Sequence, residues 1–185
     1  MENNFEIFKE RVLSEFKTKD TCKEYFVMAK KATDFEQLSE VYFKAITFCL
    51  ANEVPSLNTW ATIDGIRQKY GIYASDSVNE FVPKLREIVC LGTSEGNIEI
   101  ERSAKIYLKH QSKIYLTAKK YSYVCVDLLD DAEIYITAEQ GATVSIFKYN
   151  GNGKIFIANS TKTECIKIKE MKIKTYNLET NGNKN

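Results

Sequence analysis

The chain has 185 residues, a formal net charge of +1, 44% hydrophobic residues and 28% charged residues. These values are ordinary for a soluble globular protein, and the length allows one good core or two small ones. The near-neutral charge argues against a dedicated nucleic-acid binder, because contact with phosphates requires a basic surface. No apolar run approaches the ~20 residues of a membrane span, so we expect no membrane association.

The first residues and the cysteines indicate a reducing compartment. Residues 1–6 have neither a basic start nor an apolar core, so we expect no secretion signal. The five cysteines are far apart, and no pair has the spacing of a zinc or redox motif. Cys49, Cys90 and Cys125 lie among apolar residues, as buried free thiols usually do. We therefore expect no metal and no cofactor.

Helical signals open the chain. Apolar residues from Phe5 to Phe16 recur at helical spacing. Thr21 followed by Glu24 has the spacing of a capping box, and it predicts a second helix that extends to Lys31.

The next helices follow the same kind of signal. Thr33 and Glu36 repeat the capping-box spacing, and residues 38–49 carry one broad apolar face, which is the strongest helix prediction in the chain. Pro55 ends this helix, because the residue before a proline avoids the helical conformation. A short helix is expected around residues 57–69. Residues 76–86 are harder to assign, since a proline argues against one continuous helix there.

We interpret residues 1–86 as a helical domain, in the form of a small bundle of three or four helices. The region is rich in aromatic residues for its size. Core packing explains most of them, and contact with a neighbouring chain is the alternative use.

A repeat motif, small-x-aliphatic-x-aliphatic, dominates the second half. Its copies start 8 to 11 residues apart, at Gly96, Ala104, Ser112, Ser122, Ala132, Ala142 and Gly153. Alternate residues of a strand point to opposite faces, so the three defined positions share one side. Each copy is therefore expected to place one small and two aliphatic side chains in a common interior, with the small one at a tight corner.

Regular repetition of this motif predicts a β-solenoid, in which coils stack on their neighbours. The class is then α+β, with a helical domain at 1–86, a β-repeat domain at 87–175 and a disordered tail at 176–185. An antiparallel β-sandwich or barrel is the alternative, because it also has regular short strands. Asn-Gly, the strongest hairpin signal, occurs within the repeats only before the last copy, at Asn150-Gly151 and Asn152-Gly153, and its absence between the other copies favours the solenoid.

After Ile157 the motif decays. Its expected small position is occupied by Glu164, and lysines then alternate with apolar residues from Lys167 to Lys174. Lysines on a terminal strand discourage edge-to-edge growth, so we interpret this stretch as a cap. A nucleic-acid-binding ridge is the alternative, although Glu164 and Glu170 interrupt the charge.

The candidates for catalysis are few. His110, the single histidine, lies on an expected bend, where Ser112 or Cys125 would have to complete a nucleophilic triad. A solvated loop histidine is the simpler interpretation. Asp127, Asp130 and Asp131 form a second cluster, which corner geometry explains without a cation. The sequence therefore predicts no enzyme.

The outward positions of the motif carry the candidate binding surface. Aromatic rings there are suited to contacts with proteins, glycans or nucleobases. Cover by the helical domain is the alternative. The candidate residues are Tyr107, Tyr115, Tyr123, Tyr135 and Phe156.

Three stretches carry a resemblance: Phe48–Leu57, Lys69–Tyr73 and Ile106–Tyr149. Together they resemble uncharacterised phage and prophage proteins of gut Bacteroidetes, which join a helical part to a short β-repeat. The resemblance implies a viral or mobile-element origin, and therefore a location in the host cytoplasm or in the virion. It transfers no catalytic residues.

These observations predict a non-enzymatic phage-type protein that self-associates or binds a protein partner through the β-repeat and helical surfaces. A homo-oligomer is expected, because repeat stacks expose end coils and outer faces. The alternative is an anti-defence protein that binds or sequesters a small ligand such as a nucleotide signal.

Overall fold

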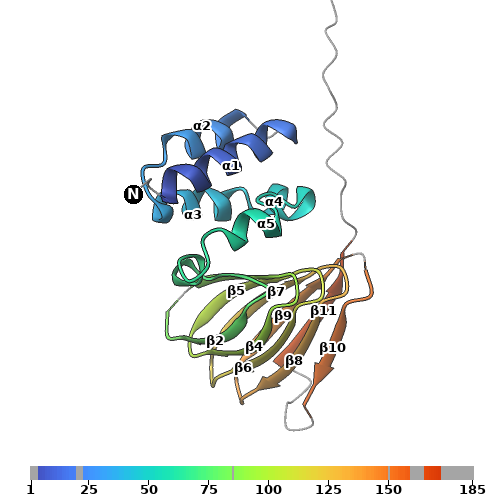
Figure 1. Ribbon diagram of the computed structural model, residues 1–185. Coiled ribbons are helices and arrows are strands. Elements are labelled where there is room, and N and C mark those ends of the chain that lie inside the picture. Colours follow the sequence, from blue (N-terminus) through green and yellow to red (C-terminus); the bar gives the residue numbers. More distant parts are fainter. Residues whose placement is uncertain (1–3, 20–22, 85, 150, 159–164, 172–185) are drawn as a thin grey trace, which may run out of the picture.

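The computed structural model describes residues 4–19, 23–84, 86–149, 151–158 and 165–171. Over these residues a helical N-terminal region is followed by a β-solenoid (Figure 1). The described helices are α1 (Asn4–Thr18), α2 (Lys23–Lys31), α3 (Phe35–Lys44), α4 (Ile46–Asn52) and α5 (Leu57–Ala61), followed by the 3-10 helix η1 (Arg67–Tyr70). None of the described helices is long and apolar enough to cross a membrane.

Two details of the helices differ from the sequence-based prediction. The helix expected over residues 38–49 is interrupted at Ala45, where the backbone leaves the helical conformation between α3 and α4. The N-cap of α3 is Asp34 rather than Thr33, because the Asp34 carboxylate accepts a hydrogen bond from the backbone N–H of Gln37. The Gln37 side chain accepts from the N–H of Thr33, the residue before the N-cap, so the contacts resemble a capping box one residue later than predicted.

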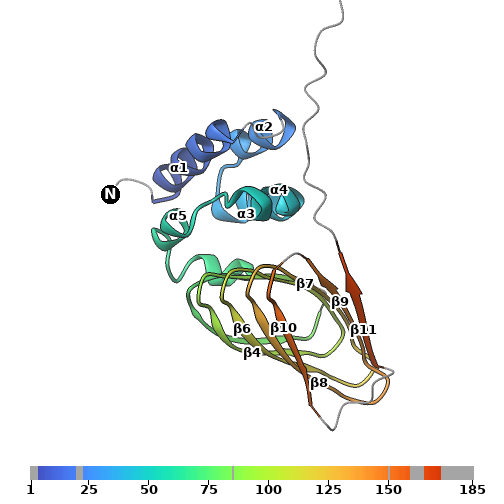
Figure 2. The ribbon, with the colours of Figure 1, turned by 90° about the vertical axis from the view of Figure 1, so that its right-hand side faces the viewer.

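Every described strand pairing is parallel, so the antiparallel sandwich is excluded as the fold. Sheet A has the strand order β1-β3-β5-β7-β9-β11, and sheet B has the order β10-β8-β6-β4-β2. The chain alternates between the two sheets, which enclose the solenoid interior (Figure 2). The strands of sheet A are β1 (Ile72–Ala74), β3 (Arg86–Leu91), β5 (Ser103–Leu108), β7 (Tyr123–Leu128), β9 (Thr143–Lys148) and β11 (Ile166–Glu170). Those of sheet B are β2 (Ser77–Val82), β4 (Glu95–Ile100), β6 (Lys113–Ala118), β8 (Glu133–Ala138) and β10 (Lys154–Ile157).

The solenoid begins earlier than the sequence suggested. Strands β1 and β2 lie within residues 1–86, which we expected to be helical, because these strands lack the repeat motif. The expected tail at 176–185 lies outside the described residues. The terminal strand β11 carries Lys167 and Lys169 at the edge of sheet A, as expected for a cap, whereas Glu164, Lys172 and Lys174 are outside the described part of the chain.

The repeat motif forms the interior of the solenoid. Its aliphatic positions from Ile98 to Ile146 are at most 1% exposed. Each coil contains two copies of the motif, one in each sheet. A strand therefore pairs with the strand two copies later in the sequence. For example, Ile106 of β5 pairs with Val126 of β7.

The small residues fit the corners, with one correction. Ser112, Ser122 and Ala132 are buried at corners where the chain enters a strand. The first two copies, however, are two residues out of register, because Gly96 pairs with Ile114 and Ala104 with Val124. The corner of the Gly96 copy is instead occupied by Ser94, which is fully buried.

The helical region packs against the outer face of sheet A, at the first coils of the solenoid. One hydrophobic cluster joins Phe8, Tyr42 and Trp60 of the helices to Val89 and Tyr107 of the sheet. Figure 1 shows the helices on the sheet A side, so the outer face of sheet B points away from them.

Candidate functional site

Three of the five candidate aromatic residues form a stack on the outer face of sheet B. Tyr115, Tyr135 and Phe156 occupy paired positions of β6, β8 and β10. The ring centroids are 4.8 Å apart between Tyr115 and Tyr135, and 4.4 Å apart between Tyr135 and Phe156. We call these residues the aromatic row.

The other two candidates lie on sheet A, because consecutive copies of the motif alternate between the sheets. Tyr107 is only 2% exposed under the helical region, and its hydroxyl donates a hydrogen bond to Glu87. Its assignment to an exposed binding surface is therefore wrong. Tyr123 is 52% exposed, but it lies on β7 and so on the sheet opposite the aromatic row.

A row of alternating charges runs beside the aromatic row. Glu95, Lys113, Glu133 and Lys154 occupy paired positions across four strands of sheet B. Ion pairs join Lys113 to Glu95 at 3.0 Å and Lys154 to Glu133 at 2.7 Å. The Lys113 ammonium also lies 5.4 Å from the centre of the Tyr115 ring and 5.7 Å from that of Tyr135. The outer face of sheet B is thus regular, amphipathic and uncovered by the helices.

Polar side chains terminate the interior columns of aliphatic residues. At the first coil Glu80 continues the column of Ile98 but is a carboxylate, which accepts hydrogen bonds from Tyr73 and from Arg86. At the last coil Lys148 pairs with Glu170 at 3.9 Å. A second copy stacked on either end would meet these charges.

The corner between β5 and β6 connects the solenoid to α4. His110 has a positive φ of 62° there, and its Nδ1 accepts a hydrogen bond from the N–H of Gly92 in the previous coil. Its Nε2 lies 3.3 Å from a carboxylate oxygen of Glu53. The neutral tautomer that carries its proton on Nε2 satisfies both contacts. His110 is therefore fixed at a corner rather than solvated in a loop, which corrects the simpler interpretation.

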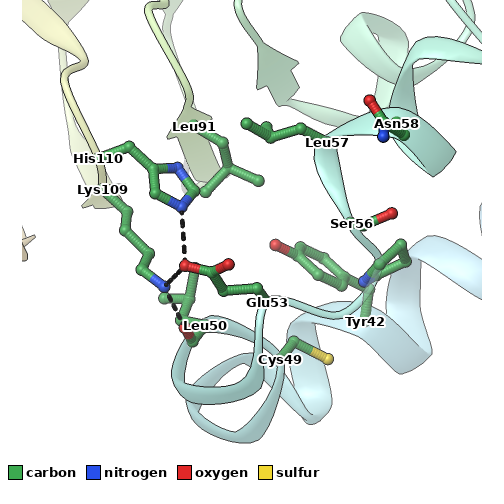
Figure 3. A pocket seen from close by; sticks show the side chains of 11 residues that line it. Tyr42, Cys49, Leu50, Glu53, Ser56, Leu57, Asn58, Leu91, Lys109 and His110 are labelled. Atoms are coloured by element: carbon green, nitrogen blue, oxygen red, sulfur yellow. Dashed lines mark hydrogen bonds and ion pairs between the residues drawn. The ribbon is translucent and has the colours of Figure 1, made fainter. Parts of the chain in front are cut away.

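Lys109 makes the closest contacts at this corner. Its ammonium donates to the carbonyl of Leu50 at 2.6 Å and to Oε1 of Glu53 at 3.2 Å (Figure 3). The hydrogen bond and the charge of Lys109, with a smaller contribution from His110, lower the pKa of Glu53. Asp130 of the next coil lies 3.9 Å from the same ammonium.

These contacts border a cavity of about 300 Å³, which we call the junction pocket. Leu50, Pro55, Leu57 and Leu91 give it an apolar wall, and the polar lining includes Tyr42 and Glu53. Burial, followed by the proximity of Cys49, raises the pKa of Tyr42, and burial also raises the pKa of the Cys49 thiol. Both groups are therefore neutral near pH 7. No pattern in the sequence indicated this pocket, because its walls come from segments about 50 residues apart in the chain.

The residues considered for catalysis do not contact one another. The ring nitrogens of His110 contact Gly92 and Glu53, whereas Ser112 is buried in the interior and Cys125 lies on the outer side of sheet A. Burial raises the pKa of the Cys125 thiol.

The three aspartates also diverge. Asp127 lies within β7, Asp130 accepts from the N–H of His110, and Asp131 accepts from Asn152. Across the described ranges, no three His, Cys, Asp or Glu side chains are placed to hold a metal ion.

Comparison with known proteins adds no relative. No protein-family model matches the chain, and no curated protein or solved structure matches it.

Proposed function

We propose that this is a non-enzymatic interaction protein that binds a protein partner through the outer face of sheet B. The observation that carries the proposal is the aromatic row beside the row of alternating charges. Tyr115 is 38% exposed and Phe156 is 40% exposed, and their strands, β6 and β10, lie on the side of the solenoid away from the helices (Figure 1). Apolar rings bordered by charged side chains match the composition of protein interfaces, which have an apolar centre and a polar rim.

The orientation of the rings favours a protein over a glycan. The planes of Tyr135 and Phe156 differ by only 9°, and their centroid separation is close to the ~4.7–4.9 Å spacing of neighbouring strands. The rings therefore stack along the solenoid axis, and their faces contact neighbouring rings. A partner meets ring edges and tyrosine hydroxyls, whereas a sugar or base would need a ring that lies flat with its face outward.

The side of the solenoid is a better candidate for association than its ends. A copy stacked against the first or last coil would have to desolvate the Glu80–Arg86 or the Lys148–Glu170 ion pair, which is costly. If the protein self-associates, the proposal places the contact between the outer faces of sheet B of two copies. The partner is then a second copy of this chain.

The resemblance to phage proteins supports a role in virion assembly or in contact with a host protein. The alternative, capture of a nucleotide signal, has less support. Lys109, the lysine of the junction pocket, already contacts Glu53 and the Leu50 carbonyl, so its charge is neutralised before a phosphate arrives.

The proposal is tested by site-specific photo-cross-linking. A cross-linking amino acid at Thr137, exposed on the outer face of β8, is compared with the same group at Lys30, exposed on α2. We expect a discrete protein adduct from position 137 only, in extract of the natural host or with the pure protein. We also expect Thr137→Arg to abolish the interaction. Equal adducts from both positions, or a strict monomer with no adduct, would contradict the proposal.

A further inference from the structure

The junction pocket is lined by a tyrosine hydroxyl that is open to the cavity. Tyr42 is 4% exposed, and among the described residues no hydrogen bond reaches its hydroxyl. In Figure 3 this hydroxyl points into the space bordered by Leu57, Glu53 and His110. Because no described residue supplies a partner, this hydroxyl is available to donate to, or accept from, a ligand in the pocket.

Glu53 provides a second free polar atom. Lys109 and His110 both contact its Oε1, and no described residue hydrogen-bonds to its Oε2. Figure 3 shows this second oxygen on the side of Tyr42. A carboxylate oxygen accepts hydrogen bonds only, so the group that it selects in a ligand is a donor.

The charges around the pocket add a preference for a cation. Lys109 already has Glu53 and Asp130 within 3.9 Å, so its charge is balanced. Glu15 lies behind the wall, where its carboxylate accepts from the N–H and hydroxyl of Ser56 and from the Thr59 hydroxyl. An anionic ligand would face this surplus of carboxylates, whereas an ammonium group would be attracted to it.

The remaining wall is apolar and the volume is small. Leu50, Leu57, Leu91 and Pro55 surround the cavity of about 300 Å³, which lies at the lower end of the ~300–1,000 Å³ typical of ligand sites. We propose that the junction pocket binds a small amine with an apolar body, whose ammonium donates to Glu53 and to the hydroxyl of Tyr42. This inference is independent of the partner surface on sheet B.

Three probes that share one ring and differ in charge test the proposal: 2-phenylethylamine, 2-phenylethanol and 3-phenylpropanoate. Binding to the full chain is followed by the backbone amide resonances of Glu53, Ser56 and Asn58, with each probe raised to about 10 mM, which largely saturates a site of millimolar Kd. We expect the amine to bind most tightly, the alcohol more weakly and the carboxylate least. A carboxylate that binds as tightly as the amine, or three probes that leave these resonances unchanged, would overturn the proposal.

Variants assign the contacts. Tyr42→Phe removes only the hydroxyl and is expected to weaken amine binding about five- to tenfold, the usual effect of one lost hydrogen bond. Tyr25→Phe, the same change in α2 outside the pocket, is the matched control and should leave binding unchanged. Glu53→Gln should remove the preference for the amine over the alcohol. Equal affinities of the Tyr42→Phe and Tyr25→Phe variants, or a preference that survives in Glu53→Gln, would show that the pocket residues do not select the ligand.

Discussion

The ammonium of Lys109 lies 3.2 Å from Glu53 Oε1 and 2.6 Å from the carbonyl oxygen of Leu50, although these residues are more than 50 positions apart. Leu50 lies in the last turn of α4, where carbonyl groups have no partner within the helix. Lys109 therefore caps a helix from the corner of another structural element. This contact adds a polar link to the hydrophobic cluster that joins the helical region to the solenoid.

Replacement of Lys109 tests this connection. Lys109→Met keeps the length of the side chain but removes its donor, so we expect the free energy of unfolding to fall by about 1–3 kcal/mol. Urea denaturation measures the change. Lys120→Met, at an exposed corner position, is the control and should alter stability by less than about 0.5 kcal/mol. Equal effects of the two substitutions would show that Lys109 does not hold the junction.

The pH dependence of stability should reveal Glu53. Its pKa is lowered in the folded state, chiefly by the hydrogen bond from Lys109, from an ordinary value of 4.5. Its ionised form therefore stabilises the fold above that value, and this contribution is lost as the pH falls through the folded-state pKa. We expect Glu53→Gln to be less stable than the natural chain at pH 7, and we expect the difference to shrink as the pH falls below 4.5. A difference that persists in acid would contradict this assignment.

Asp127 should show the opposite sign. Burial raises its pKa above the ordinary 3.8, and Lys105 only partly opposes the effect. A raised carboxyl pKa means that stability is lost as the pH rises through it. Asp127→Asn should therefore be more stable than the natural chain at pH 7, and this gain should shrink as the pH falls toward 3.8. Thermal unfolding at a series of pH values measures it. A gain that is independent of pH would point to a cause other than ionisation.

The aromatic row should contribute to stability as well as to the surface. Tyr135 stacks on both Tyr115 and Phe156, so Tyr135→Ala removes two ring contacts and should cost about 1–3 kcal/mol. Tyr123→Ala is the control, because Tyr123 is exposed on the other sheet and no aromatic stack includes it among the described rings. Urea denaturation of both variants measures whether stacking within the aromatic row contributes to the free energy of unfolding. Similar losses for the two would mean that stacking contributes nothing special.

Glu80 should prevent end-to-end association. Glu80→Leu extends the aliphatic column of Ile98 to the edge of β2 and removes the partner of Arg86. We expect this variant to self-associate as its concentration rises, which light scattering would detect. Glu10→Leu introduces the same side chain at an exposed position of α1 and should remain like the natural chain. If Glu80→Leu behaves as Glu10→Leu does, the polar end is not a cap.

Much of the fold could be read from the sequence, because its signals are local. The repeat motif predicted a solenoid, since a period of two within each strand and a regular return between strands leave few ways to bury the aliphatic residues. Amphipathic spacing likewise placed α1, and capping-box spacing placed α2. Strand β2 was missed because it carries no motif: Glu80 pairs with Ile98, where the later coils have aliphatic residues, and such a polar stretch resembles a loop in the sequence.

The candidate site depended on which segments meet. The sequence alone determined the repeat, its inward face and the presence of outward aromatics. Only the tertiary structure decided that alternate copies belong to different sheets, which buries Tyr107 and aligns Tyr115 with Tyr135 and Phe156. It also brought Glu53 and Tyr42 to the corner of Lys109 and His110. The physical reason is that a strand's pattern fixes which side of the strand is buried, whereas the neighbours across a sheet or a helix interface are set by long-range packing.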